Sequence, residues 1–492
     1  MHSVPAPDSN SEKSPARARP SVRFADDLLR HRPVHVVWEL TLACNLRCQH
    51  CGSRAGIARR DELSTAECLD VVRQLADLGT REISLIGGEA YLRRDWLTIV
   101  KAIADAGMHC GLQTGGRALT EEKIRQAVDA GLRTIGVSVD GPRDIHDRLR
   151  GVAGSHERAL AAVRSAVRAG LEPGVNTQIN ALSQPYLRDV FATIVEAGAK
   201  FWQVQLTVPM GNAADNADML LQPCDIVETI DVLADLFERG RRDGLRLIPG
   251  NNVGYFGPYE HMWRTLTAEP TYWQGCSAGE TTLGLEADGK IKGCPSLPGE
   301  RYSGGMARHV TIAEAIAALA PKTAGRDGIR ERGFCGSCYY RNVCRAGCTW
   351  MADALTGQRG DNPYCYYRAR QLSQKGLRER VVKTAEAPGH SFDTARFAIV
   401  LEDRMGVPKP ESLARDVNKR RRGRKLQLCG NCHEYFFMSE RRCPHCRAVN
   451  RSTKPAVMDG GAAVRQLVDQ IERETQALYA IVRETAVGKP VA

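Results

Sequence analysis

The chain has 492 residues, 43% hydrophobic and 25% charged, which is ordinary for a globular protein of two or three domains. It contains no run of about 18 apolar residues. Its first twenty residues have no apolar core, which argues against a secretory signal. The formal net charge of +11 permits an acidic partner without requiring one. The unusual feature is 17 cysteines, which in a cytoplasmic protein indicate metal binding rather than disulfides.

The first part of the chain is divided into a disordered polar arm, residues 1–34, and an α/β domain, residues 35–255. Apolar runs typical of strands alternate with amphipathic helices, the first of which begins at Ser64 with a capping box to Glu67. The six strand-like runs are residues 35–42, 82–88, 109–116, 134–141, 174–180 and 201–208. This alternation predicts parallel strands in a barrel or an open sheet, with the chemistry at the carboxyl ends of the strands.

Three cysteines follow the first of these strands. Cys44, Cys48 and Cys51 have Cys-x3-Cys-x2-Cys spacing, which can hold three irons of a [4Fe-4S] cluster and leave the fourth without a protein ligand. A zinc site completed by His50 is the alternative, but adjacent His50 and Cys51 would not easily share one tetrahedral ion. The array therefore indicates an iron–sulfur reaction centre.

The array resembles the cysteine motif of the radical S-adenosylmethionine (SAM) superfamily. Gly87, Gly88 and Glu89 follow the second strand and resemble its Gly-Gly-Glu motif, although Ala90 stands where proline is usual. Residues 138–141 resemble its ribose-side strand. The resemblance implies a partial (β/α)6 barrel and SAM bound to the open iron. It further implies a 5′-deoxyadenosyl radical that abstracts substrate hydrogen, and an electron donor such as flavodoxin or ferredoxin.

The same resemblance suggests contacts to SAM and substrate. The two glycines would let the backbone approach the methionine ammonium, and the glutamate would serve as an acceptor or an anchor. Ser138 and Asp140 would hydrogen-bond the ribose, and Arg150 would clamp the SAM carboxylate. Three glutamines at the same end are candidate substrate contacts, or ordinary strand residues: Gln178, Gln203 and Gln205.

A second group of seven cysteines lies in residues 256–370, where the helix–strand alternation stops. It resembles the SPASM domain of radical SAM enzymes that act on peptides and proteins, and this resemblance implies two auxiliary iron–sulfur clusters. One cluster would use Cys335, Cys338, Cys344 and Cys365, and the other Cys276, Cys294 and Cys348 with a fourth position open or filled by another group. Two structural zinc sites are the alternative, which seven ligands suit poorly. Pro295 follows Cys294 where sulfatase-maturing members have an acidic base, so sulfatase maturation is disfavoured.

The remaining chain is divided into a connector, a zinc-ribbon-like knuckle and a helix, at residues 371–425, 426–450 and 459–488. The knuckle has two Cys-x2-Cys pairs, Cys429 with Cys432 and Cys443 with Cys446, which suit one tetrahedral zinc ion. A rubredoxin-like iron is the alternative. The basic run at 419–425 can bind an acidic peptide or nucleic acid, but no aromatic stripe accompanies it. A solvated linker is expected there, and nucleic acid is not an expected partner.

Together these patterns predict a cytoplasmic radical SAM/SPASM maturase of a ribosomally made peptide or protein. It would form a crosslink, a C–C or thioether bond, or an oxidation. One alternative is a radical SAM dehydrogenase or cofactor-biosynthesis enzyme acting on a small molecule or another protein. An alternative of another class is a zinc-binding nucleic-acid or scaffold protein whose cysteines are all structural. Iron and sulfide content distinguishes the enzymes from the scaffold.

Overall fold

The computed structural model describes residues 26–27, 30–264, 271–323, 333–416 and 425–449. The chain divides into two compact units, Met1–Phe437 and Met438–Ala492. Residues 1–25 of the predicted arm, residues 419–424 of the basic run and the predicted helix at 459–488 lie outside the described residues. Among the described helices, none has the length and apolar character needed to span a membrane.

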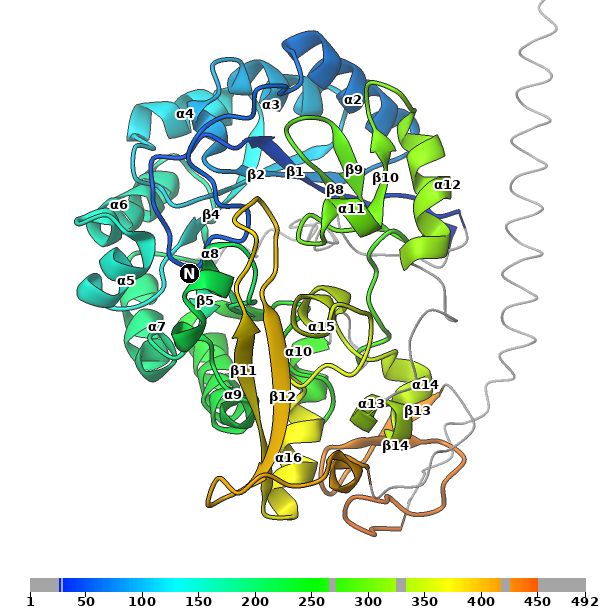
Figure 1. Ribbon diagram of the computed structural model, residues 1–492. Coiled ribbons are helices and arrows are strands. Elements are labelled where there is room, and N and C mark those ends of the chain that lie inside the picture. Colours follow the sequence, from blue (N-terminus) through cyan, green and yellow to red (C-terminus); the bar gives the residue numbers. More distant parts are fainter. Residues whose placement is uncertain (1–25, 28–29, 265–270, 324–332, 417–424, 450–492) are drawn as a thin grey trace, which may run out of the picture. The chain divides into compact units, whose positions relative to one another are not determined.

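A parallel sheet forms the centre of the first unit (Figure 1). Its parallel strands in chain order are β1 (His35–Thr41), β2 (Glu82–Gly87), β3 (His109–Thr114), β4 (Leu132–Ser138), β5 (Gly174–Ile179), β6 (Phe201–Leu206) and β7 (Arg246–Pro249). Each strand pairs with the next one, so the order in the sheet follows the chain. The predicted α/β fold is confirmed, and β7 adds a short strand to the six that were predicted.

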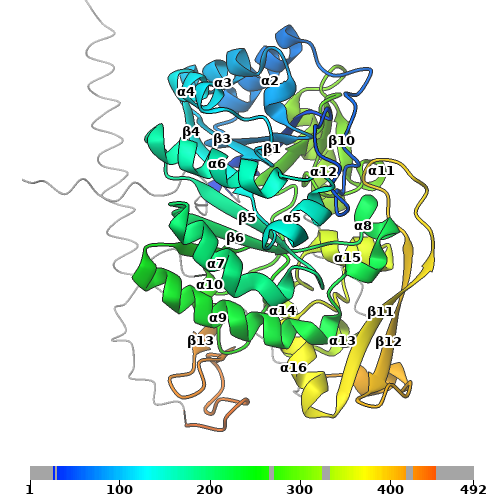
Figure 2. The ribbon, with the colours of Figure 1, turned by 90° about the vertical axis from the view of Figure 1, so that its left-hand side faces the viewer.

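Helices cover the outer face of this sheet (Figure 2). They are α2 (Thr65–Asp77), α3 (Trp96–Asp105), α4 (Glu121–Asp129), α5 (Arg143–Arg150), α6 (Ser155–Arg168), α7 (Leu187–Glu196) and α9 (Ile226–Asp243). The short helix α8 (Asn212–Asp215) lies instead against the loop after β1, where the Asn212 N–H donates to the Cys51 carbonyl at 3.0 Å. The predicted capping box begins α2, where the Ser64 N–H donates to Glu67 Oε2 at 2.7 Å and the Glu67 N–H donates to Ser64 Oγ at 3.3 Å. Trp202 of β6 is fully buried and meets Phe191 of α7 edge-on, with ring centroids 6.1 Å apart. Because side chains alternate along a strand, the neighbours of Trp202 point to the inner face.

Three further strands extend the sheet beyond β1. They are β8 (Thr282–Leu285), β9 (Lys290–Lys292) and β10 (Ser303–Met306). β8 runs parallel to β1, and β9 and β10 follow it in antiparallel pairings. These strands lie where the helix–strand alternation of the sequence stops. β8 occupies the edge of β1 because the backbone groups of β1 need hydrogen-bond partners there.

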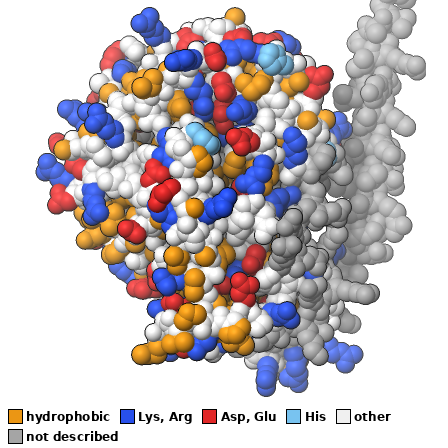
Figure 3. All heavy atoms as spheres, in the orientation of Figure 1, with side chains coloured by type: hydrophobic (Ala, Val, Ile, Leu, Met, Phe, Trp, Pro, Cys, Tyr) orange, Lys and Arg blue, Asp and Glu red, His pale blue; other side chains and the backbone are white. Residues whose placement is uncertain are grey.

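Short helices and two hairpins make up the rest of the described first unit. The helices are α10 (Glu260–Arg264), α11 (Gly299–Tyr302), α12 (Ile312–Thr323), α13 (Gly333–Ser337), α14 (Arg341–Cys344), α15 (Thr349–Thr356) and α16 (Tyr366–Gln374). The hairpins are β11 (Leu377–Ala385) with β12 (Arg396–Asp403), and β13 (Leu426–Leu428) with β14 (Tyr435–Phe437). The residues predicted to be a connector thus contain the end of α16 and a long hairpin. Basic and acidic side chains are interspersed over the face shown in Figure 3.

Candidate functional site

The three cysteines of the first array lie on the loop that leaves β1. The loop is closed at its base, where the Cys44 N–H donates to the Gly56 carbonyl at 3.1 Å and the Gly56 N–H donates to Leu42 at 3.0 Å. Its middle is bonded to the end of α5, since the Arg47 N–H donates to the Arg150 carbonyl at 3.0 Å. The loop therefore holds its shape through backbone bonds to two different parts of the barrel.

Each sulfur of this array faces a hydrogen-bond donor. The Cys44 sulfur accepts from the Leu46 N–H at 3.4 Å, and the Cys51 sulfur accepts from the Ala55 N–H at 3.4 Å. The Cys48 sulfur lies 3.8 Å from an Arg150 nitrogen. Donors aimed at cysteine sulfurs are what iron–sulfur sites use to stabilise and tune a cluster, so the three residues fit such a group.

Burial keeps two thiols of the array, those of Cys44 and Cys48, protonated when no metal is present. It raises the pKa of Cys44 to about 11 and that of Cys48 to about 12. Metal ligation by cysteine requires the thiolate, so binding must release these protons. Burial, together with the Arg150 charge, also lowers the pKa of His50 to about 4, which leaves its ring neutral.

The Gly-Gly-Glu turn after β2 packs directly on the cysteine loop. The Gly88 N–H donates to the Thr41 carbonyl and the Glu89 N–H to the Ala43 carbonyl, each at 2.8 Å. A Cβ on Gly87 would lie 2.1 Å from the Thr41 oxygen, and one on Gly88 would lie 2.1 Å from the Ala43 oxygen. Gly87 also has a φ of 147°. Glycine is therefore required here for contact between two backbones.

Glu89 connects the ends of β2 and β3. Its carboxylate accepts the Gly115 N–H at 2.7 Å and the Thr114 hydroxyl. The side chain is buried, and burial raises its pKa to about 7 in spite of these hydrogen bonds. Of the two roles suggested by the sequence, the observed contacts are those of an anchor.

Asp140 and Arg150 form a buried ion pair beside the cysteine loop. Arg150 Nε donates to Asp140 Oδ2 at 2.7 Å, and Asp140 Oδ1 accepts the Gln178 N–H at 2.9 Å. Burial would raise the pKa of Asp140, but the Arg150 charge holds it below its usual range. Asp140 is fully buried, and its two carboxylate oxygens accept hydrogen bonds from Arg150 and from the Gln178 backbone.

Amide side chains line the inner face of the barrel near these residues. Gln178 of β5 is paired with Gln205 of β6, and Asn176 is paired with both Gln203 and Ser138. The Asn176 amide donates to Gln113 of β3. The three predicted glutamines therefore lie together on the face opposite Trp202, which is consistent with substrate contact.

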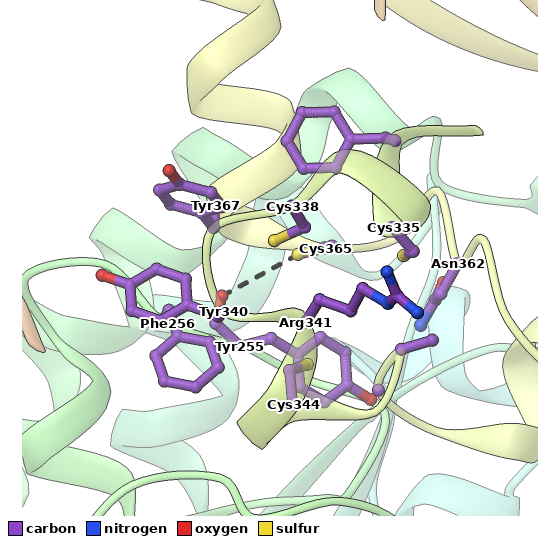
Figure 4. Close-up of a pocket in the computed structure, with 13 residues that line it drawn as sticks. Tyr255, Phe256, Cys335, Cys338, Tyr340, Arg341, Cys344, Asn362, Cys365 and Tyr367 are labelled. Atoms are coloured by element: carbon purple, nitrogen blue, oxygen red, sulfur yellow. Dashed lines mark hydrogen bonds between the residues drawn. The ribbon is translucent and has the colours of Figure 1, made fainter. Parts of the chain in front are cut away.

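Four of the seven downstream cysteines surround one pocket. Cys335, Cys338, Cys344 and Cys365 line it together with an aromatic shell (Figure 4). The aromatic residues are Tyr255, Phe256, Phe334, Tyr340 and Tyr367. This is the set that the resemblance assigned to one cluster.

The other three cysteines lie near one another. Cys276 and Cys294 pack against a small apolar core of Ala278, Leu297 and Tyr302. Burial raises the pKa of Cys348, and the charges of Cys276 and Cys294 raise it further. The structure thus brings together the members of each set that the resemblance implied.

Tyr255 contacts both cysteine sets and was not singled out from the sequence. Its hydroxyl accepts the Cys348 N–H at 3.0 Å, and its carbonyl lies 3.8 Å from the Cys365 sulfur. Tyr255 and Phe256 have φ values of 76° and 61°, which bulky residues rarely adopt. The only signal in the sequence is the pair of flanking glycines, Gly254 and Gly257, which also have positive φ.

The two C-terminal cysteine pairs form turns of the same local geometry. In the first unit, the His433 N–H donates to the Cys429 carbonyl at 3.0 Å, and His433 has a φ of 58°. In the second unit, the Arg447 N–H donates to the Cys443 carbonyl at 2.8 Å, and Arg447 has a φ of 62°. Each Cys-x2-Cys pair is therefore a tight turn closed four residues after its first cysteine.

Comparison with known proteins identifies the domain built around the first array. Residues 38–193 match the radical SAM superfamily. The chain is a radical SAM enzyme. This domain implies SAM and a [4Fe-4S] cluster as cofactors.

Named relatives of the enzyme fall into two groups. The AdoMet-dependent heme synthase of Oleidesulfovibrio alaskensis is 26% identical over 359 residues, covering 68% of this chain and 88% of that protein. The PqqA peptide cyclase of Bradyrhizobium diazoefficiens is 26% identical over 372 residues, covering 74% and 92%. Streptococcus suis SuiB bound to S-adenosylmethionine shares the fold, with a TM-score of 0.55 and 16% identity over 69% of this chain and 79% of that one. SuiB is also known bound to its precursor peptide SuiA.

Replacing Gly88 with alanine should displace the cysteine loop. The new Cβ would meet the Ala43 carbonyl, at a cost of about 1–3 kcal/mol of stability. Iron per reconstituted chain should fall by about four. Gly56→Ala is the matched control, since that glycine belongs to the same loop and has no atom within 4 Å of an added Cβ. Equal iron content in the two variants would contradict the claim that position 88 must be glycine for the cysteine loop to form.

Proposed function

We propose that this enzyme is a maturase that modifies a ribosomally made peptide or protein. Cys44, Cys48 and Cys51 would hold the cluster whose open iron binds SAM. When bound, these cofactors supply a 5′-deoxyadenosyl radical that removes a hydrogen atom from the substrate. The observation that carries the proposal is the seven downstream cysteines gathered into two sets, because it matches the pattern of peptide-modifying members.

The surrounding residues would orient the two ligands. Arg150 is fixed by Asp140 and lies beside Cys48, where its remaining donors can meet the SAM carboxylate. We propose Ser138, at the end of β4, as the ribose contact, and the backbone at Gly87 and Gly88 as the boundary of the methionine end. The amides on the inner face would receive the substrate.

The charges of the barrel interior favour a peptide over a highly carboxylated ligand. Two cations of this region are paired: the half-buried Arg59 bonds to Glu39 at 2.9 Å, and the buried Lys292 lies 2.7 Å from Glu286. The exposed inner face offers neutral amides, which donate to and accept from a peptide backbone equally well.

A second candidate is an enzyme that acts on a tetrapyrrole. The relatives with this specificity include the AdoMet-dependent heme synthases, and one of them, from Methanosarcina barkeri, is 28% identical over 351 residues. This candidate falls within the alternative of a cofactor-biosynthesis enzyme. A nucleic-acid-binding protein is expected to carry a basic patch, whereas basic and acidic side chains are interspersed on the face shown in Figure 3.

We further propose two auxiliary iron–sulfur clusters in the downstream sets. The pocket with four cysteines would hold one cluster in apolar surroundings, and Cys276, Cys294 and Cys348 would hold the other. An electron donor such as flavodoxin or ferredoxin would reduce the enzyme, and an auxiliary cluster would accept the surplus electron of an oxidation.

Replacing all of Cys44, Cys48 and Cys51 with alanine should abolish reductive SAM cleavage. Anaerobically reconstituted enzyme should contain about 12 irons, and the triple variant about 8, because the auxiliary sets remain. The measurements are iron, sulfide and 5′-deoxyadenosine after reduction with dithionite. If the variant still forms 5′-deoxyadenosine, the assignment of SAM cleavage to these three cysteines is wrong. If the wild-type protein contains zinc and no iron, the proposed iron–sulfur clusters are wrong.

Deuterium transfer should identify the substrate class. The probes are a perdeuterated candidate precursor peptide, chosen from short reading frames that neighbour the gene, and iron-coproporphyrin deuterated on its propionate side chains. A maturase should place deuterium in 5′-deoxyadenosine only with the peptide. Transfer from the porphyrin alone would replace the proposed function with the second candidate.

We propose that the two C-terminal turns bind one zinc ion. Support comes from the matching geometry of the two turns, each within its own unit, and from the two Cys-x2-Cys pairs in the sequence, which suit one tetrahedral ion. Zinc would then stabilise this segment without taking part in catalysis.

Each of the substitutions Cys432→Ser and Cys446→Ser should remove about one zinc per chain and leave the iron content unchanged. Plasma emission spectrometry of the as-isolated protein measures both metals. Cys224→Ser is the control, because that half-buried cysteine belongs to none of the sets. Zinc retention in both knuckle variants, or the spectrum of a single iron bound by four thiolates, would overturn the assignment.

A further inference from the structure

The end of the β11–β12 hairpin lies against the loop that carries the first cysteine array. Figures 1 and 2 show the hairpin extending beside the barrel, with its far end turned toward the strands. We call residues Gly389–Thr394, at that end, the strap. The Phe392 N–H donates to the Gly52 carbonyl at 3.0 Å, next to Cys51. The strap thus bonds directly to the backbone of the array.

A side-chain bond joins the same two segments across 339 positions of sequence. Arg54 Nε donates to Asp393 Oδ1 at 3.0 Å. Arg54 also bonds to Asp215 of α8, but Asp215 is 43% exposed whereas the Asp393 side chain is 1% exposed. The Asp393 carboxylate further accepts the His390 N–H at 3.0 Å, so it orders the strap as well. Asp393 is therefore the more buried of the two carboxylates that hold Arg54, and the one that belongs to the strap.

Arg54 lies next to the backbone group that donates a hydrogen bond to the third cysteine of the array. It lies between Cys51 and Ala55, and the Ala55 N–H donates to the Cys51 sulfur. Its own φ is 51°, a conformation that arginine does not favour without outside support. A shift of Arg54 would therefore move a donor away from that sulfur.

The other side of the strap contacts the strand that leads to the downstream cysteines. The Phe392 ring lies over Lys292 Nζ of β9, with 3.8 Å between the nitrogen and the ring centroid. Lys292 is fully buried and precedes Cys294 by two residues. The strap is therefore held between the two cysteine-bearing segments.

We infer that the strap positions the first cysteine array, with Asp393 acting through Arg54 to fix the Cys51 side of the loop. Asp393 and Arg54 are positioning residues for SAM cleavage. The inference rests on the proposed function of Cys44, Cys48 and Cys51. Hydrogen bonds to cluster sulfurs set reduction potential, so the effect is visible in the cluster itself as well as in turnover.

The test compares Asp393→Asn with two matched changes in the full, reconstituted enzyme. Asp215→Asn removes the exposed partner of Arg54, and Glu386→Gln removes an exposed charge from the same hairpin. Asp393→Asn should shift the electron paramagnetic resonance spectrum of the reduced, SAM-bound cluster. It should also lower 5′-deoxyadenosine formation about 10-fold or more, with iron content and melting temperature unchanged. Asp215→Asn should do less, and Glu386→Gln should match wild type.

The inference is overturned if Asp393→Asn has the spectrum and the 5′-deoxyadenosine rate of the wild type. It is also overturned if Asp393→Asn and Glu386→Gln change these two readouts equally. If Asp393→Asn does not fold, Arg54→Lys serves in its place. It keeps the charge but loses the forked donor geometry, so the same spectral shift is expected and an unchanged spectrum overturns the inference. If the wild-type enzyme binds no iron or forms no 5′-deoxyadenosine, the proposed function is wrong. If Asp393→Asn behaves like the wild type, only the inferred role of the strap is wrong.

Discussion

The contact between two backbones at the ends of β1 and β2 determines the geometry of the whole site. The Gly-Gly-Glu turn can bond to the cysteine loop only because neither glycine has a side chain in the way. That contact fixes where the cysteines stand relative to β2, and Glu89 extends the connection to β3. Arg150 then reaches Cys48 from the far side, at the end of α5. The site is thus assembled by consecutive strands of one sheet, each bonded to the next.

Much of this arrangement was predictable because its signals are local. The cysteine spacing, the glycine pair after the second strand and the Ser64 capping box each occupy a few adjacent residues, and the structure has them in the expected elements. The β8–β9 hairpin was missed, although Asp288-Gly289 between two apolar runs is a turn signal. The β11–β12 hairpin was missed because its loop of ten residues, although it contains the turn dipeptide Pro388-Gly389, is longer than the two to five residues typical of a recognisable hairpin. Contacts such as Arg54 with Asp393 join distant positions, and no pattern within one sequence indicates them.

Charged and neutral polar side chains occupy different places around the site. Asp140 with Arg150, and Glu39 with Arg59, place opposite charges together behind the site, where an unpaired charge would be costly. Facing the interior, the strands present amides and hydroxyls instead. A radical formed in such a space meets few groups that carry charge, while the charged pairs keep the walls rigid. Sequence patterns reveal the residue types here but not which partner each one has.

The pairing of β8 with β1 has a consequence for how this protein can be divided. β8 and β9 lie between Cys276 and Cys294, so the cysteine-rich region donates strands to the barrel sheet. A fragment that ended with the barrel helices would leave the β1 edge bare, and bare edges recruit other chains. The catalytic core is therefore not a portable module. Anyone who builds chimeras from this scaffold must carry the chain at least through β10.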